Sequence, residues 1–118
     1  MPAKPFEASV RSQPDAQPLA AVIDLHGEIN ATAEARLNAA YAEAEAQNPP
    51  TIVLNFGDVS YINSTGIALI VGLLAQARKS HRRLVVCGLS EHYQEIFRIT
   101  RLSDFMEIFN DESSALAG

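Results

Sequence analysis

Residues 51–67, Thr-Ile-Val-Leu-Asn-Phe-Gly-Asp-Val-Ser-Tyr-Ile-Asn-Ser-Thr-Gly-Ile, change from a strand pattern to a helix pattern. The β-branched run 51–54 is typical of a strand that is covered on both faces. A turn is predicted over 55–58, and it leads into a second short extended run. The small polar residues 63–66 then open a helix that reaches Lys79. A strand followed at once by a helix is the repeating unit of an α/β fold.

The same alternation continues on both sides of this stretch. The expected strands are 6–10, 19–25, 51–54, 83–88 and 105–109, and the expected helices are 31–47, 67–79, one that begins at Ser90, and 111–116. Strands that alternate with helices imply a largely parallel sheet with right-handed crossovers. The sequence therefore predicts a small α/β domain, with a mixed, mostly parallel sheet of about five strands and about four helices.

The first of these helices has one apolar face. The residues on that face fall at i, i+4, i+7, i+8 and i+11, as one stripe of a helix requires, and they are Ala33, Leu37, Ala40, Tyr41 and Ala44. Asn30 or Thr32 can cap the start of this helix. The stripe is expected to pack against the sheet.

A chain of 118 residues suits a single domain. Residues 1–18 hold four of the six prolines and are expected to form an N-terminal edge strand and a proline-rich loop, the loop running from Ser12 to Pro18. Residues 19–118 are expected to form the body of the domain.

Composition excludes several classes of protein. A net charge of −5 disfavours binding to nucleic acid. No apolar run reaches the roughly 18 residues of a membrane-spanning helix, and residues 1–5 do not resemble a secretory signal. The single cysteine, Cys87, fits a reducing compartment. The sequence predicts a cytoplasmic protein that is monomeric when free.

Nothing in the sequence supports catalysis. The three histidines are scattered, so no metal site is expected. Neither a Gly-x-Ser-x-Gly elbow nor a glycine-rich phosphate loop is present, so no cofactor is expected. Cys87 lies inside an apolar strand, where a cysteine is usually a small buried hydrophobe.

Ser64 has two interpretations. A serine in the first turn of a helix is normally its cap. However, Asn63 already offers a capping side chain, which frees Ser64 for another role. Ser64, Thr65 and Gly66 directly follow an apolar run, so the two hydroxyls are expected at the carboxyl edge of the sheet, where α/β proteins tend to place function. The helix that follows is too apolar to be half solvated, which indicates a partner near its start.

Residues 53–67 resemble the signature of the STAS domain in bacterial anti-sigma factor antagonists, which reads roughly V-L-D/N-L-x-x-V-x-F-I-D-S-S/T-G-L. Residues 25–30 are similar to the family's earlier L-x-G-E-L-D element. Residues 84–90 and 97–102 are similar to its later strand and the stretch after that strand. The resemblance covers residues 19–109 in unbroken order, and the central motif is its most specific part.

This resemblance implies a regulatory binding protein. In the family the serine after the aspartate accepts a phosphate, and that position is Ser64 here, with Thr65 as a fallback. The unphosphorylated antagonist binds a switch-kinase anti-sigma factor and frees the sigma factor; phosphorylation of the serine then dissociates the complex. The partner-binding residues implied here are Asn30, Asn63, Ser64, Thr65, Gly66 and Ile67.

Two departures from the family pattern keep alternatives open. The usual aspartates are Asn30 and Asn63 here, which keep the size and the capping ability but lose the charge. A chain that binds its partner constitutively, without phosphorylation, therefore remains possible. So does a non-catalytic STAS subunit that docks on a membrane lipid or anion transporter. A nucleotide-binding role is a third reading, although no phosphate loop supports it.

Two further groups of residues have competing interpretations. The basic run Arg78, Lys79, His81, Arg82 and Arg83 is either a patch for an acidic partner or the set of cations that a helix C-terminus prefers. Phe56 and Tyr61 flank the central motif and are expected in the core rather than at a contact.

Overall fold

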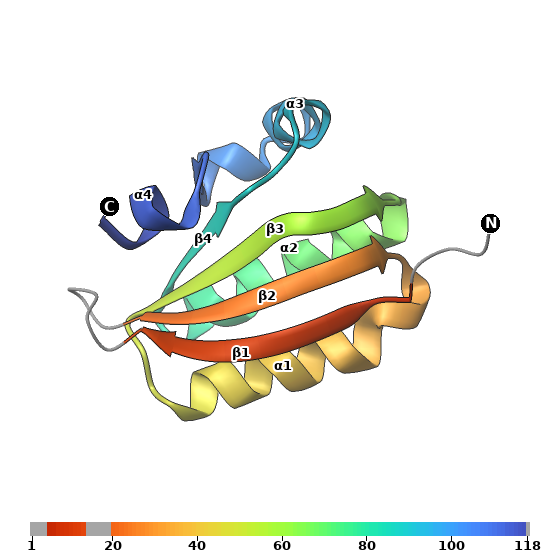
Figure 1. Ribbon diagram of the computed structural model, residues 1–118. Coiled ribbons are helices and arrows are strands. Elements are labelled where there is room, and N and C mark those ends of the chain that lie inside the picture. The colour runs from red at the N-terminus through yellow and green to blue at the C-terminus, as the bar shows by residue number, and fades with distance from the viewer. Residues whose placement is uncertain (1–4, 14–19, 118) are drawn as a thin grey trace.

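The computed structural model describes residues 5–13 and 20–117 (Figure 1). The strands are β1 (Glu7–Gln13), β2 (Ala20–Ile29), β3 (Thr51–Ile62), β4 (Arg83–Cys87) and β5 (Glu107–Phe109). The α-helices are α1 (Glu34–Ala46), α2 (Ser64–Lys79), α3 (Glu91–Ile99) and α4 (Glu112–Ala117). Two 3-10 turns, η1 (Ala31–Ala33) and η2 (Leu102–Asp104), complete the described elements.

The five strands form one sheet in the order β1-β2-β3-β4-β5. β1 is antiparallel to β2, and every later pair is parallel. The predicted α/β fold, with a mixed and mostly parallel sheet and four α-helices, is therefore confirmed. β1 pairs with β2 as far as Gln13, so Ser12 belongs to the strand and not to the predicted loop. Residues 14–18 of that loop lie outside the described residues.

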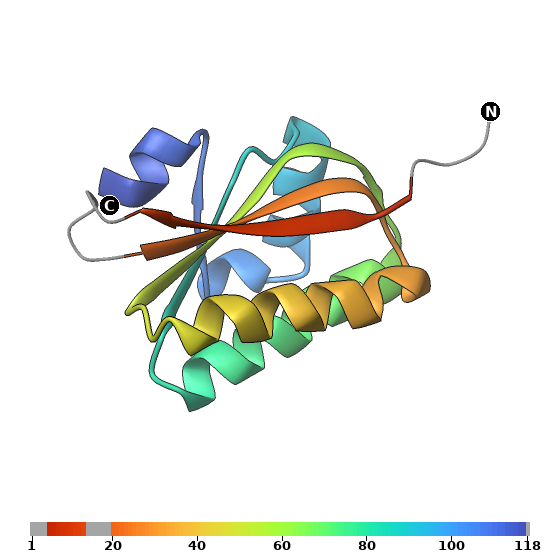
Figure 2. The same cartoon turned by 60° about the horizontal axis from the view of Figure 1, so that its bottom comes forward.

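Helices cover both faces of the sheet. Figure 2 shows α1 and α2 side by side below the sheet and α4 above it. The larger core lies on the side of α1 and α2 and includes the predicted stripe of the first helix, which is buried as expected. A smaller cluster lies under α4 and consists of Val22, Val53, Val85, Cys87 and Ala115. Since successive side chains of a strand point to opposite faces, the continuous apolar runs of β2 and β3 serve both clusters.

β3 does not turn at residues 55–58, and the predicted turn there is wrong. The strand continues for 12 residues and absorbs two extra residues as bulges. Between the pairs Asp24↔Asn55 and His26↔Asp58, β3 advances by three residues while β2 advances by two. The Asn55 side chain accepts a hydrogen bond from the Gly57 N–H at 2.9 Å, which mimics a turn without ending the strand.

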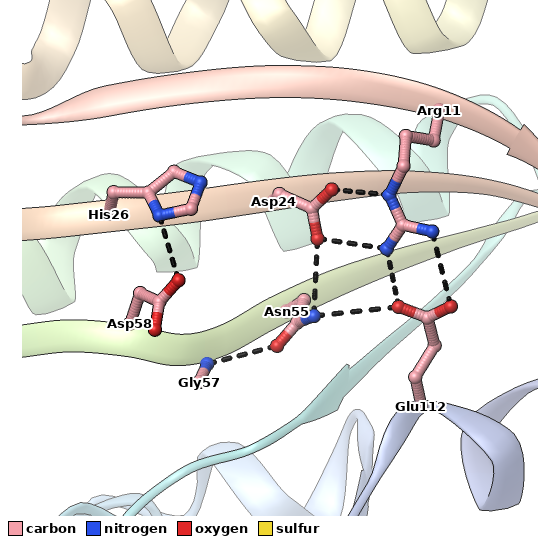
Figure 3. Close-up of polar contacts among 7 residues, drawn as sticks. All are labelled: Arg11, Asp24, His26, Asn55, Gly57, Asp58 and Glu112. Carbon is pink, nitrogen blue, oxygen red and sulfur yellow. Dashed lines mark hydrogen bonds and ion pairs between the residues drawn. The ribbon is translucent and has the colours of Figure 1, made fainter.

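A polar network ties the first strand to the last helix on the α4 side of the sheet (Figure 3). Arg11 on β1 donates to both carboxylate oxygens of Asp24 on β2, one of these bonds measuring 2.9 Å, and it also contacts Glu112 on α4. Asn55 donates to the same Asp24 carboxylate at 3.1 Å. His26 and Asp58 form a separate pair at 3.0 Å. The network holds elements from the two ends of the chain against the middle of the sheet.

The network predicts a loss of stability in acid. Hydrogen bonds from Arg11 hold the pKa of Asp24 below its ordinary value of 3.8. A carboxylate with a lowered pKa in the folded state stabilises the fold above its unfolded pKa, and this stability is lost as the pH falls through the folded pKa. We expect Asp24→Asn to lower the free energy of unfolding by about 1–2 kcal/mol at pH 7, a modest amount because Arg11 is partly exposed to solvent.

Urea unfolding of both proteins between pH 7 and pH 2 measures this effect. The difference in the free energy of unfolding between wild type and Asp24→Asn should become smaller once the pH falls below about 4. Asp58→Asn is the matched control, because Asp58 is 74% exposed and contacts only His26 among the pairs found in the described residues. A difference that stays constant down to pH 2 would contradict a role for the Asp24 charge.

Candidate functional site

The candidate site lies where β2 and β3 end and α2 begins. The N–H of Asn63 donates to the carbonyl of Ile29, the last residue of β2, at 3.2 Å. The Asn63 side chain accepts a hydrogen bond from the Gly66 N–H at 2.8 Å, which caps α2. Asn63 therefore joins the helix to the sheet with its backbone and satisfies the first turn with its side chain.

Gly66 allows α2 to start this close to the sheet. A Cβ atom at this position would lie 2.2 Å from the Ile29 carbonyl oxygen and 2.9 Å from a side-chain carbon of Ile62. No side chain larger than hydrogen fits against a backbone carbonyl at that distance. The first turn of α2 is consequently fixed in position by direct contact with the end of β2.

Tyr93 supports the same junction from α3. β4 pairs with β3 only as far as Asn55, so the backbone of Ile62 has no strand on that side. The buried Tyr93 hydroxyl takes the place of a strand there: it accepts from the Ile62 N–H at 2.9 Å and lies 3.4 Å from the Ile62 carbonyl oxygen. Ile62, the last residue of β3, is thus held by β2 on one side and by Tyr93 of α3 on the other.

Ser64 and Thr65 are the first two residues of α2, and both are exposed. Within residues 5–13 and 20–117, neither hydroxyl has a hydrogen-bond partner in the protein. The first turn of α2 also contains no acidic residue. A hydroxyl here is accessible, and it lies at the positive end of the helix dipole, where added negative charge is favoured.

The other predicted partner-binding residues lie around this hydroxyl pair. Asn30 follows Ile29 directly, and its side chain accepts from the Thr32 N–H at 2.9 Å, so it caps η1. Ile67 is half-buried and packs against the larger core. The structure brings all six residues of the predicted set to one end of the sheet: Asn30, Asn63, Ser64, Thr65, Gly66 and Ile67.

Sequence reasoning missed two residues at this end of the sheet. Phe56 is buried as expected, but Tyr61 is 50% exposed, so the expectation that Tyr61 lies in the core is wrong. The second bulge of β3 falls between Val59 and Tyr61, and the extra residue changes which face of the sheet the side chains after it point to. The sequence does not predict a place for Tyr93 in the site, because no local signal links it to Ile62, 31 residues earlier.

Other chemistry in the described part of the chain is limited. Burial raises the pKa of the Cys87 thiol to about 11, so this thiol stays protonated at neutral pH. Among the described residues, no three His, Cys, Asp or Glu side chains gather closely enough to hold a metal ion. None of the described helices is both long and apolar enough to cross a membrane.

The sequence of this chain is similar to that of a known protein family. A sequence profile of the STAS domain matches residues 8–115. An anti-sigma-B factor antagonist from Listeria monocytogenes is 34% identical over 86 residues, which cover 73% of this chain and 75% of that protein. The chain belongs to the STAS domain family, and its curated relatives include anti-sigma factor antagonists.

Solved structures share the fold. An anti-sigma factor antagonist from Mycobacterium paratuberculosis superposes with a TM-score of 0.79 at 19% identity, over 95% of this chain and 92% of that one. The phosphorylated form of the Bacillus cell fate determinant SpoIIAA superposes with a TM-score of 0.64 at 22% identity, over 91% and 96%. A sulfate transporter family protein from Wolinella succinogenes gives 0.73 at 17% identity, over 82% and 81%.

The contact at Gly66 predicts a large effect of a single methyl group. Gly66→Ala should lower the free energy of unfolding by about 1–3 kcal/mol, because the added Cβ must push α2 away from Ile29. Gly72→Ala is the matched control on the same helix, since a Cβ there meets nothing within 4 Å. It should raise stability by about 0.5–1 kcal/mol through helix propensity. Equal effects of the two variants in urea unfolding would contradict the close approach.

A second pair of variants tests which residue caps α2. Asn63→Ala removes the acceptor for the Gly66 N–H and should cost about 1 kcal/mol of unfolding free energy. Ser64→Ala removes a hydroxyl without a partner in the described structure, and should change stability by less than about 0.5 kcal/mol. Thermal or urea unfolding measures both losses of stability. A larger loss in Ser64→Ala than in Asn63→Ala would show that Ser64 is the cap.

Proposed function

We propose that this chain is an anti-sigma factor antagonist that binds an anti-sigma factor with serine kinase activity, and that phosphorylation of Ser64 ends this binding. The observation that carries the proposal is that Asn63, and not Ser64, caps α2. Asn63 caps the helix, which leaves the Ser64 hydroxyl exposed. An exposed hydroxyl without a partner in the described residues can be modified without breaking a contact of the fold.

The fold should tolerate a phosphate at this position. A phosphoserine carries about −1.5 to −2 charges and three strong acceptor oxygens. At the first residue of α2 these oxygens meet the helix N-terminus, whose first turn has no acidic side chain to repel them. The modification should therefore leave the fold in place.

The complex should not tolerate the phosphate. Ser64 and Thr65 are exposed and lie among the residues proposed to contact the partner. A partner surface that fits the neutral hydroxyl would have to desolvate a dianion without a cation to pair with it. Phosphorylation thus switches binding, and no large conformational change is needed.

The relatives support this assignment. The Listeria protein named as an anti-sigma-B factor antagonist aligns with 73% of this chain. SpoIIAA, which has the same fold, was solved in a phosphorylated form. Asn63 in place of the family's aspartate keeps the cap through its side-chain oxygen and removes a negative charge near Ser64. The proposal places the chain in the cytoplasm, as a monomer when free, with a protein and not a nucleic acid as its direct partner.

One observation favours a second candidate function. The fold is also that of a sulfate transporter family protein from Wolinella succinogenes. A STAS subunit that docks on a separate lipid or anion transporter would use the same domain without phosphorylation. Phosphate on Ser64 separates the two candidates, because only the first depends on it.

The direct test is the mass and phosphopeptide map of the protein purified from its native cells in growth, starvation and stress. We expect one phosphate, on Ser64, in at least one condition. Ser64→Ala should remove it, whereas Thr65→Ala, the matched control on the next exposed hydroxyl, should keep it. The absence of phosphate in all conditions, or its retention in Ser64→Ala, would refute the assignment of Ser64.

A phosphate mimic tests the effect on binding. Ser64→Asp should keep the unfolding midpoint of the wild type or raise it slightly, since it adds an acid to the first turn of α2. Binding to the anti-sigma factor encoded by the same genome should weaken by about 2–3 kcal/mol, roughly a hundredfold in Kd by titration calorimetry. Unfolding of Ser64→Asp would show instead that Ser64 is a structural residue.

A further inference from the structure

The face of α2 that carries Ser64 continues along the helix as an exposed stripe. Ser64, Val71 and Arg78 are spaced seven residues apart, close to two helical turns, so they lie on one face. All three are exposed, Val71 by 44% although it is apolar. With a rise of about 1.5 Å per residue, Arg78 lies roughly 21 Å from Ser64 along the helix axis.

An exposed aromatic ring extends this stripe beyond the helix. The predicted strand 105–109 starts two residues too early: β5 begins at Glu107, and Phe105 precedes it and is 57% exposed. The Arg78 guanidinium lies over its ring, 5.4 Å from the ring centroid. Beside them is a hollow of about 240 Å³, with Leu74 and Met106 among its lining residues. Isolated exposed apolar residues are common, but here an exposed aromatic ring, an arginine and a hollow of mixed polar and apolar lining lie together.

The structure divides the basic run at the end of α2 into two parts. Arg82 and Arg83 are used within the fold: Arg82 donates to the Pro49 carbonyl at 2.6 Å, and Arg83 donates to Glu107 at 2.8 Å. Arg78 and Lys79 are exposed, and within the described residues no carboxylate lies within 4 Å of either side chain.

The acidic side chains around the hollow do not balance these two charges. Asp104 and Glu107 line it, but Asp104 lies 3.9 Å from Arg101 and Glu107 pairs with Arg83. On a chain with a net charge of −5, the end of α2 is therefore a local positive surface beside the exposed ring of Phe105.

We infer that Val71, Arg78, Lys79 and Phe105, here called the Phe105 surface, form a second contact for the protein that binds around Ser64. This inference rests on the proposed function and names the chemistry of the partner. The contacting segment is acidic and carries apolar side chains: one covers Phe105, a second covers Val71 about two helical turns from Arg78, and carboxylates face Arg78 and Lys79. Arginine and aromatic residues are the types that contribute most energy at protein interfaces, and opposite charge favours the correct partner.

Site-specific photo-crosslinking in the native cells tests this inference. The crosslinking analogue p-benzoylphenylalanine replaces Phe105 in one variant, Thr65 in a second, and Ala42, which is exposed on α1, in a control. We expect the variants at 65 and 105 to capture the same protein, with an Asp- or Glu-rich peptide at the 105 crosslink, and the variant at 42 to capture neither.

A charge reversal within the surface sharpens the test. Arg78→Glu, combined with the reporter at 105, should lower the yield of the adduct by about tenfold or more. Arg36→Glu is the charge-reversal control on α1: Arg36 is exposed, and its hydrogen bond to the Phe6 carbonyl, at 3.1 Å, involves no residue of the Phe105 surface. Thermal unfolding of each variant establishes that it is folded before yields are compared.

The results of these experiments distinguish failure of the Phe105 surface from failure of the proposed function at Ser64. Capture at 65 without capture at 105, capture of different proteins, or a yield at 105 that Arg78→Glu leaves unchanged would overturn the Phe105 surface while the proposed function stands. Capture at 105 of a protein that never crosslinks at 65, together with the absence of phosphate on Ser64, would overturn both. One shared partner with an acidic contact peptide and sensitivity to Arg78→Glu supports the inference.

Discussion

The contact between the first turn of α2 and the last carbonyl of β2 is the constraint on which the rest of the site depends. Gly66 lets the helix approach the Ile29 carbonyl, and the Asn63 backbone bonds to that same carbonyl at 3.2 Å. Because Asn63 also caps the helix, the hydroxyls of Ser64 and Thr65 are left for solvent or a partner. Tyr93 fixes the preceding residue from the other side. These contacts fix the first turn of α2 and leave the Ser64 hydroxyl exposed. A phosphate on that hydroxyl can then change binding without changing the fold.

Most of the fold could be predicted because its signals are local. The apolar runs of β2 and β3 and the helical stripe of α1 each follow from the spacing of side chains within one segment. The capping sequence before α2 was also readable, since small polar residues directly follow a strand, but the helix begins at Ser64 and not at the predicted Ile67. The resemblance to the STAS signature rests on the same stretch, so fold and family were indicated by the same residues.

The features that could not be predicted depend on contacts between distant segments. Asn55, Gly57 and Asp58 are typical of a turn, yet neighbouring strands keep residues 55–58 extended, and the extra residues of β3 form bulges. The exposure of Tyr61 follows from such a bulge, and the support from Tyr93 joins residues 31 positions apart. The basic run after α2 could be interpreted in two ways until the partners of Arg82 and Arg83 were known.

The central claim is that phosphate on Ser64 changes the surface and not the fold. The most direct measurement compares amide chemical shifts in the NMR spectra of the unmodified protein and of the protein with phosphoserine incorporated at position 64. We expect the amide shifts to change around Asn30 and residues 63–67 and to remain unchanged in β1, α4 and the far end of α2. Changes spread through the sheet and the core would contradict it, because they would show that the phosphate rearranges the domain.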